Sequence, residues 1–262
     1  MARILINNEW YEQVGASTLY EDEFRRILLD QAPRLFPNCW LVEFEPTVFS
    51  EYGSARPDLA LIDRDYRGWW VVEAERGDHS LHGHVVPQVE VLARARYGPE
   101  EADALCRADH HLDGQRIRAM VRGTQPQVLV IVNASRPAWS EALRPFGALV
   151  QIVEVFRSDQ NSHIYRMNGD YPRLSDDILT LCYLDPVLPG SLVISSPATL
   201  QLGPSKVLNL RIGGLVTEWV IRESSDTSWL MPVGISPSLK RGKYAILKDQ
   251  GGQLILQPHA NL

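Results

Sequence analysis

Residues 56–75 read RPDLALIDRDYRGWWVVEAE and carry the strongest structural signal in the chain. Two apolar runs, 56–63 and 69–75, flank the polar segment RDYRG, which is the pattern of two β-strands joined by a tight turn. Most residues inside these runs are Leu, Ala, Ile, Val or Trp, so the bodies of both strands are expected to be buried. The stretch therefore predicts a β-hairpin in the interior of the protein.

Three acidic residues lie at one end of this hairpin. If the turn is centred in RDYRG, Asp58 falls opposite Glu73, and directly opposed side chains share one face of a sheet, with Cβ atoms about 4.5–5.5 Å apart. Glu75 lies two residues beyond Glu73 and projects on the same face. The register thus predicts that the three carboxylates converge.

Converging carboxylates destabilise a fold unless something neutralises them. A bound divalent cation does so, and hard oxygen ligands with room for water suit Mg²⁺ or Mn²⁺. The alternative is that the three acids simply end their strands in solvent. The flanking apolar residues favour the metal site, because they bury the strands that carry the acids.

The segments around the hairpin alternate between helical and extended patterns. A helix is expected over 17–31, ended by Pro33. The element order α-β-β-β-α-β-α-β predicts an α/β fold, in which helices flank a mixed central sheet. The other expected strands are 40–46, 127–134 and 148–156, and the other expected helices are 86–97, 99–108, 113–122 and one that starts at Ser140.

The charge changes sign along the chain near Pro186. Residues 1–186 carry 19 basic and 28 acidic residues, a net charge of −9, whereas 187–262 carry 7 basic and 4 acidic residues, a net charge of +3. The second segment contains short alternating strands, with a hairpin turn at 248–252. We therefore expect two domains, an α/β domain over 1–186 and a small all-β barrel or sandwich over 187–262.

With these residues the chain resembles the PD-(D/E)XK nuclease superfamily, whose members share the restriction-endonuclease-like fold. The resemblance covers about residues 17–157. Pro57 and Asp58 match the PD element, and the segment Glu73–Glu75 occupies the place of the (D/E)-X-K element. The core order of that family, α-β-β-β-α-β, is also the order expected here.

Two further side chains fit the same resemblance. Glu23, on the preceding helix, is similar to the additional acid that many members place beside the metal, and Glu21 and Asp22 compete for that assignment. Gln88, on the following helix, is similar to a glutamine that several nuclease branches direct at the site. The resemblance thus implies a catalytic set of Asp58, Glu73, Glu75, Glu23 and Gln88, with the metal held by Asp58, Glu73 and Glu23.

One position departs from the family pattern. The usual lysine is replaced by Glu75, and no lysine occurs before Lys206. A few restriction enzymes have glutamate at this place, where it can position or deprotonate the attacking water while the metal stabilises charge on the phosphate. Arg76 or Arg56 can supply the missing positive charge, but arginine cannot act as a base.

The resemblance implies hydrolysis of phosphodiester bonds, most often in DNA, with Mg²⁺ or Mn²⁺ as cofactor. We expect an endonuclease of antiviral defence or DNA repair, acting as a homo-oligomer or as a partner subunit of a defence complex. The alternative is a non-catalytic module that keeps the nuclease fold and binds nucleic acid or protein. A nuclease that stays silent until it meets a partner is a third hypothesis.

Two histidine-containing segments are also candidates for chemistry. His79, His82 and His84 have a spacing at which imidazoles can share a cation, although a fourth ligand is missing. The alternative is a loop that borders the active site, contacts substrate or solvent, and can contribute a base. The segment DHH at 109–111 is expected to be a polar helix end.

Basic residues in the second segment suggest where nucleic acid binds. Lys240, Arg241 and Lys243 lie close together beside Tyr244, and small barrels bind single strands by pairing charged grooves with aromatic platforms. We expect DNA contacts from these three residues and from Arg76. A solvated loop and a protein-binding surface are the alternatives.

The composition sets outer limits on function. The chain has 262 residues, 45% of them hydrophobic, yet it contains neither a long apolar run nor a signal-peptide pattern, so we expect a cytoplasmic protein without membrane contact. Its three cysteines are too few and too widely spaced for a disulfide framework. The net charge of −6 suggests repulsion of a nucleic acid. Acids that hold metal are neutralised by the ion, however, so the formal charge overstates this repulsion.

Overall fold

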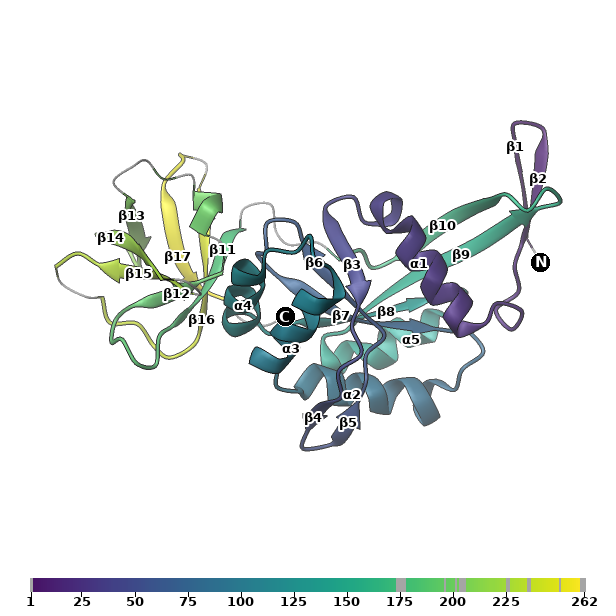
Figure 1. Ribbon diagram of the computed structural model, residues 1–262, viewed down its shortest axis with the longest axis horizontal. Coiled ribbons are helices and arrows are strands. Elements are labelled where there is room, and N and C mark those ends of the chain that lie inside the picture. The colour runs from purple at the N-terminus through teal and green to yellow at the C-terminus, as the bar shows by residue number, and fades with distance from the viewer. Residues whose placement is uncertain are drawn as a thin grey trace. The chain divides into compact units, whose positions relative to one another are not determined.

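The computed structural model describes residues 2–172, 178–195, 197–200, 202, 206–224, 227–234, 237–249 and 251–259. The chain divides into two compact units (Figure 1). Unit 1 comprises Met1–Leu61, Trp70–Arg96 and Gln127–Pro172, and unit 2 comprises Ile62–Trp69, Tyr97–Pro126 and Arg173–Leu262.

The larger sheet and its helices account for most of unit 1. The strands are β1 (Arg3–Ile6), β2 (Glu9–Gln13), β3 (Cys39–Glu43), β6 (Leu59–Asp63), β7 (Trp69–Glu75), β8 (Gln127–Val132), β9 (Leu149–Ser158) and β10 (His163–Gly169). The helices are α1 (Glu21–Leu35), α2 (Val86–Arg94) and α5 (Pro137–Leu143). A π-helical turn, Leu81–Val85, precedes α2, and a 3₁₀ turn, Arg144–Phe146, follows α5. A separate two-stranded ribbon consists of β4 (Val48–Ser50) and β5 (Gly53–Ala55).

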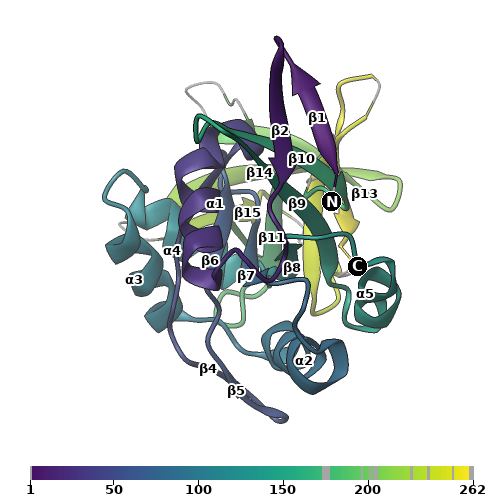
Figure 2. The same cartoon turned by 90° about the vertical axis from the view of Figure 1, so that its right-hand side faces the viewer.

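The sheet is mixed and has helices on both faces. Its strand order is β1-β2-β9-β8-β7-β6-β3, with β10 paired to β9. The neighbours β7, β8 and β9 run parallel, whereas β2 and β10 run antiparallel to β9. Figures 1 and 2 show α1 on one face of the sheet and α2 and α5 on the other. The predicted mixed central sheet flanked by helices is confirmed.

The hairpin predicted over residues 56–75 corresponds to β6 and β7, which lie in the interior of this sheet. All seven residues of β7 are buried, as are all five of β6, because helices cover both faces. The Asp63 amide donates to the Gly68 carbonyl at 3.1 Å, which closes the turn where the sequence placed it. The apolar runs therefore became adjacent strands, as predicted.

The first helix differs from its predicted bounds at both ends. It begins at Glu21 rather than at residue 17, because the Thr18 hydroxyl and amide both donate to the Gly15 carbonyl and close a turn ahead of the helix. It also continues through Pro33 to Leu35. Proline removes one helical hydrogen bond, but Leu35 and Phe36 are buried and the Phe36 amide still donates to the Ala32 carbonyl at 2.8 Å.

Other bounds agree more closely, with some additions. The helix expected from Ser140 begins earlier, at Pro137, which takes a first-turn position where its missing amide hydrogen has no consequence. The hairpin β1–β2, the ribbon β4–β5 and the edge strand β10 had no counterpart in the sequence prediction. These segments lack a clear alternation of apolar and polar residues, because few of their side chains are buried.

Unit 2 contains two helices and a closed barrel. The helices are α3 (Pro99–Ala108) and α4 (Gly114–Gly123), close to their predicted ranges. The barrel strands are β11 (Ile178–Leu184), β12 (Leu192–Ile194), β13 (Val207–Ile212), β14 (Leu215–Glu223), β15 (Ser228–Pro232), β16 (Lys243–Lys248) and β17 (Leu254–Pro258), with a 3₁₀ turn at Pro197–Leu200.

The barrel closes in the order β11-β12-β15-β14-β13-β17-β16, with β16 paired back to β11. Of the two all-β architectures expected, the barrel is therefore the observed one. β16 and β17 pair antiparallel across the predicted turn at 248–252, in which Gln250 lies outside the described residues. The first barrel strand, β11, precedes residue 187. The domain boundary between residues 186 and 187, which was inferred from charge, stays a prediction. Fully buried Trp219 and its apolar neighbours fill the barrel interior.

Candidate functional site

The three acids predicted from the hairpin line one pocket in unit 1. The pocket has a volume of about 470 Å³ and is open to solvent. It lies at the end of β7, where the chain leaves the sheet and enters the π-helical turn. Its lining residues are Glu21, Arg56, Asp58, Glu73, Glu75, His79, Ser80, His84 and Gln88.

Asp58 lies immediately before β6, and backbone contacts hold it there. Its amide donates to the Val72 carbonyl at 3.2 Å, and its Oδ2 accepts the Ala74 amide at 2.8 Å. Arg25 Nη1 lies 3.8 Å from Oδ1. The pKa of Asp58 is raised to about 6, mainly by burial and also by the negative charge of nearby Glu21, whereas the Ala74 hydrogen bond lowers it.

Glu73 is the most buried acid of the pocket, with only 2% of the residue exposed. Gln88 Nε2 donates to its Oε2 at 2.6 Å. Its other oxygen, Oε1, is buried and has no hydrogen-bond partner among the described residues. Burial raises the pKa of Glu73 well above its usual value, and repulsion from Asp58 and Glu75 adds to the shift.

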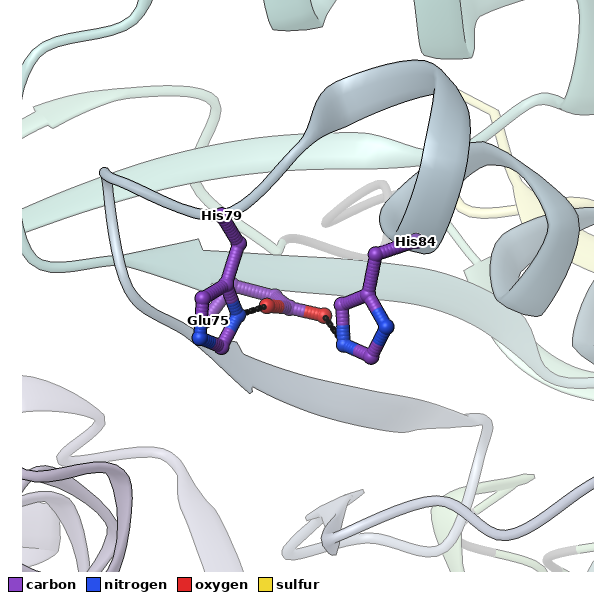
Figure 3. Close-up of side chains that lie close together, drawn as sticks. All are labelled: Glu75, His79 and His84. Atoms are coloured by element: carbon purple, nitrogen blue, oxygen red, sulfur yellow. Dashed lines mark hydrogen bonds and ion pairs between the residues drawn. The ribbon is translucent and has the colours of Figure 1, made fainter.

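Glu75 is also almost fully buried, yet two imidazoles reach it. His79 Nδ1 lies 2.6 Å from Oε2, and His84 Nε2 lies 3.5 Å from Oε1 (Figure 3). Burial raises the pKa of the Glu75 carboxyl, and the hydrogen bond with His79 partly offsets that increase. The position that the family resemblance gives to lysine is thus occupied by a carboxylate–imidazole group.

The π-helical turn after β7 positions these imidazoles. Ser80 Oγ accepts the Gly83 amide at 3.1 Å, and the His84 amide donates to the Ser80 carbonyl at 2.9 Å. The turn brings His84 back to the carboxylate; both His82 and His84 are exposed, but His84 lines the pocket and His82 does not. The spacing of the histidines in the sequence does not predict the contact of His84 with Glu75, because a π-helical turn has no simple sequence signature.

The helix acid at the pocket is Glu21 rather than Glu23. Glu21 lines the pocket, and its Oε2 lies 3.9 Å from His79 Nε2. Glu23 is exposed and is not among the lining residues. The structure therefore brings one of the competing candidates to the other acids and leaves Glu23 apart from them.

Three arginines near the acids have different positions. Arg56 lines the pocket mouth and pairs with Glu45. Arg25 also pairs with Glu45, at 2.7 Å. Arg76 pairs with Asp78 at 2.6 Å and does not line the pocket. Of the two arginines proposed to replace the lysine charge, Arg56 is the one at the pocket.

The donor atoms of the pocket fit a hard divalent cation. A buried carboxylate oxygen without a partner is costly, and Glu73 Oε1 is such an atom in a pocket that Asp58 also lines. Carboxylate oxygens with space for water are the ligands that Mg²⁺ and Mn²⁺ take. Asp58 and Glu73 are therefore the residues that would hold such an ion.

The basic residues expected to bind DNA in the barrel differ in exposure. Lys240 and Arg241 are exposed, just before β16. Lys243, the first residue of β16, is half-buried, and burial lowers its pKa to about 8. Of the three residues, Lys240 and Arg241 are therefore the exposed ones.

A second donor cluster lies in unit 2, after α3. His111 Nδ1 is 2.8 Å from Asp109 Oδ1, and the neighbouring His110 ring packs on that of His111. Both histidines are exposed. Their position after the last turn of α3 agrees with the polar helix end expected from sequence.

Comparisons with protein-family models, with curated proteins and with solved structures found no match for this chain. Among the described residues, no helix has the length and apolar character required to cross a membrane.

Proposed function

We propose that the chain is a divalent-metal-dependent nuclease that hydrolyses phosphodiester bonds in DNA at the Asp58–Glu73–Glu75 pocket. The observation that carries this proposal is the unpartnered, buried Oε1 of Glu73 in a pocket shared with Asp58. These two acids occupy the positions that the PD-(D/E)XK resemblance assigns to metal ligands. The observed order α1, β3, β6, β7, α2, β8 also supports that resemblance.

The residues of the pocket have different roles in the proposed hydrolysis. Asp58 and Glu73 would hold Mg²⁺ or Mn²⁺, and Gln88 fixes the orientation of Glu73 through its 2.6 Å hydrogen bond. The bound ion supplies positive charge to the phosphate and lowers the pKa of water. Arg56 at the mouth presents a guanidinium that can bind phosphate oxygens in a bidentate manner.

The Glu75 carboxylate takes the place of the lysine. A carboxylate can orient water or accept its proton, which lysine does in neutral form. Each oxygen of Glu75 lies close to one imidazole. We therefore assign the task of orienting water and accepting its proton to Glu75, His79 and His84 together. We propose endonucleolytic cleavage, in antiviral defence or DNA repair, by a homo-oligomer or a subunit of a defence complex.

Cleavage of supercoiled, linear and single-stranded DNA in Mg²⁺ or Mn²⁺ tests the proposal. We expect the purified protein to nick supercoiled DNA, and Asp58→Asn and Glu73→Gln to abolish nicking while the fold is retained. Glu141→Gln, at an exposed position of α5, is the matched control and should cleave as the wild type does. Nicking that persists in Asp58→Asn and Glu73→Gln would contradict the site. DNA binding without cleavage under every condition would favour a non-catalytic module.

A further inference from the structure

Glu75, His79 and His84 form a mixed nitrogen and oxygen donor set, here called the histidine cluster. One ligand atom from each residue lies within 4.8 Å of the other two. Donor atoms that share one metal ion at about 2.0–2.2 Å are themselves separated by roughly 3–4 Å. The histidine cluster therefore needs only small side-chain rotations to surround an ion.

The backbone fixes the approach of the two imidazoles. His79 follows β7 by one short turn, and His84 is returned by the π-helical turn. Their rings meet edge to face, at an angle of 85° with centroids 5.1 Å apart, so they are not stacked (Figure 3). Their nitrogens consequently approach opposite oxygens of one carboxylate. This arrangement leaves the open side of the pocket for water or substrate.

The chemistry of the donor set distinguishes it from the neighbouring acids. Asp58 and Glu73 offer oxygen alone, which suits Mg²⁺, an ion that rarely takes nitrogen ligands. Two imidazoles and one carboxylate, with further positions open, are the donor set of catalytic zinc sites and of other first-row transition metals. The Glu75 carboxylate is 3% exposed, whereas the His84 side chain is 52% exposed, so the histidine cluster joins a buried carboxylate to the solvent-facing side of the pocket.

We propose that the histidine cluster binds one borderline divalent transition-metal ion, of the class for which Zn²⁺ and Co²⁺ are probes, separately from the ion assigned to Asp58 and Glu73. This inference goes beyond the proposed function, because metal binding by the histidine cluster can be measured without any substrate. In a nuclease it would place a second cation beside the first, the arrangement that stabilises both the attacking and the leaving oxygen of a phosphodiester.

The test is metal binding by the full chain in a His110→Gln, His111→Gln background, which removes the exposed donors near Asp109. Zn²⁺ titration by calorimetry is combined with ¹⁵N NMR of the imidazoles and with the visible absorption of bound Co²⁺. We expect the His79 and His84 ring nitrogens to shift on addition of Zn²⁺. We expect His79→Gln and His84→Gln each to weaken Zn²⁺ binding by at least about 10-fold, since even partners of ligands contribute 10- to 100-fold.

The matched control is His82→Gln, because His82 belongs to the same turn but lies outside the pocket. It should bind Zn²⁺ as the background protein does. A more conservative pair, His79→Asn and His84→Asn, guards against misfolding, which circular dichroism monitors. Zn²⁺ affinity unchanged in all four variants, or His79 and His84 signals that do not move at saturation, would overturn the proposal and leave the histidine cluster as a metal-free ion pair.

The same titrations separate this proposal from the nuclease proposal. Asp58→Asn with Glu73→Gln should abolish Mg²⁺ binding while the His79 and His84 signals still shift with Zn²⁺. A protein that shows the imidazole shifts, but neither cleaves DNA nor binds Mg²⁺ through Asp58 and Glu73, supports the histidine cluster and contradicts the nuclease. A protein that cleaves with Mg²⁺ and shows no imidazole shift supports the nuclease and contradicts the histidine cluster.

Discussion

Gln88 Nε2 donates to Glu73 Oε2 at 2.6 Å, whereas the opposite oxygen of Glu73, Oε1, is buried and has no hydrogen-bond partner among the described residues. Gln88 extends from the first turn of α2, while Glu73 lies in the middle of a fully buried strand. The contact therefore joins two rigid elements. It fixes which carboxylate oxygen accepts a hydrogen bond and which one remains without a partner.

We expect Gln88→Met to weaken Mn²⁺ binding by about 10- to 100-fold, the usual effect of removing a partner that orients a metal ligand. Methionine keeps the length of the side chain but cannot donate to Glu73. The pKa of Glu73 should rise further, because the Gln88 hydrogen bond lowers it. Calorimetric titration with Mn²⁺ measures the affinity.

Gln115→Met is the control for this substitution. Gln115 is a helix residue in unit 2 whose Nε2 also donates a hydrogen bond, to the Ser224 carbonyl at 3.2 Å. Its replacement should leave Mn²⁺ affinity unchanged. Equal affinities for wild type and Gln88→Met would show that Gln88 does not orient a metal ligand.

The acids of the pocket should make the metal-free protein less stable as pH rises. The pKa of Asp58 is raised from 3.8 to about 6 in the folded state, so the folded protein keeps a proton that the unfolded chain loses. The proton on Asp58 therefore contributes fully to the free energy of unfolding below about pH 4. Its contribution decreases as the pH rises from about 4 to 6, by roughly 3 kcal/mol in total. Denaturant unfolding in EDTA across this range measures it.

Asp58→Asn should remove the Asp58 part of the pH dependence, so the variant is more stable than wild type at pH 7 and similar at pH 4. Asp78→Asn provides a comparison of opposite sign, since its pairing with Arg76 lowers the pKa of Asp78. That variant should be slightly less stable than wild type at pH 7. A stability difference between wild type and Asp58→Asn that does not vary with pH would contradict the raised pKa.

The two apolar runs and the polar turn between them were enough to predict the hairpin, because β6 and β7 are buried on both faces. The convergence of Asp58, Glu73 and Glu75 followed from the two-residue period of strands. The contact of His84 with Glu75 depends on a π-helical turn, a rare geometry that the histidine spacing does not predict. The sequence therefore indicated the acids of the site and a histidine-containing loop that could border it, but not that His79 and His84 contact Glu75.

The choice among the acids of α1 illustrates the same limit. Glu23 was assigned from the family resemblance, which places an acid on this helix but leaves Glu21, Asp22 and Glu23 in competition, because all three lie in the first turn of α1. The Gly15–Thr18 turn delays the helix and presents Glu21 to the pocket.

We expect Glu21→Gln to weaken Mn²⁺ or Zn²⁺ binding by about 10-fold, because the variant removes a negative charge from the wall of the pocket. Glu23→Gln is the matched control, since both residues lie in the first turn of α1 and interact similarly with the helix dipole. It should bind metal as the wild type does. If only Glu23→Gln weakened metal binding, Glu23 would be the helix acid beside the metal, as the sequence suggested, and Glu21 would not.

The barrel provides the last prediction, which concerns DNA affinity. We expect the double variant Lys240→Ala, Arg241→Ala to weaken binding of an oligonucleotide and to reduce the slope of log K against log salt by about 2, one for each lost phosphate contact. Lys243→Ala should have a smaller effect that disappears between pH 7 and 9, because burial lowers the pKa of Lys243 to about 8 and the residue becomes neutral in that range. Fluorescence anisotropy at several salt concentrations measures both effects.

Lys248→Ala is the control for the barrel prediction, since Lys248 is an exposed lysine at the opposite end of β16. It should leave the salt slope unchanged, because the predicted contact involves the residues around the start of that strand. An unchanged slope in Lys240→Ala, Arg241→Ala would remove the barrel from DNA binding. The pocket acids would then have to act on DNA held by other residues, and the basic residues of the barrel would fit a protein partner instead.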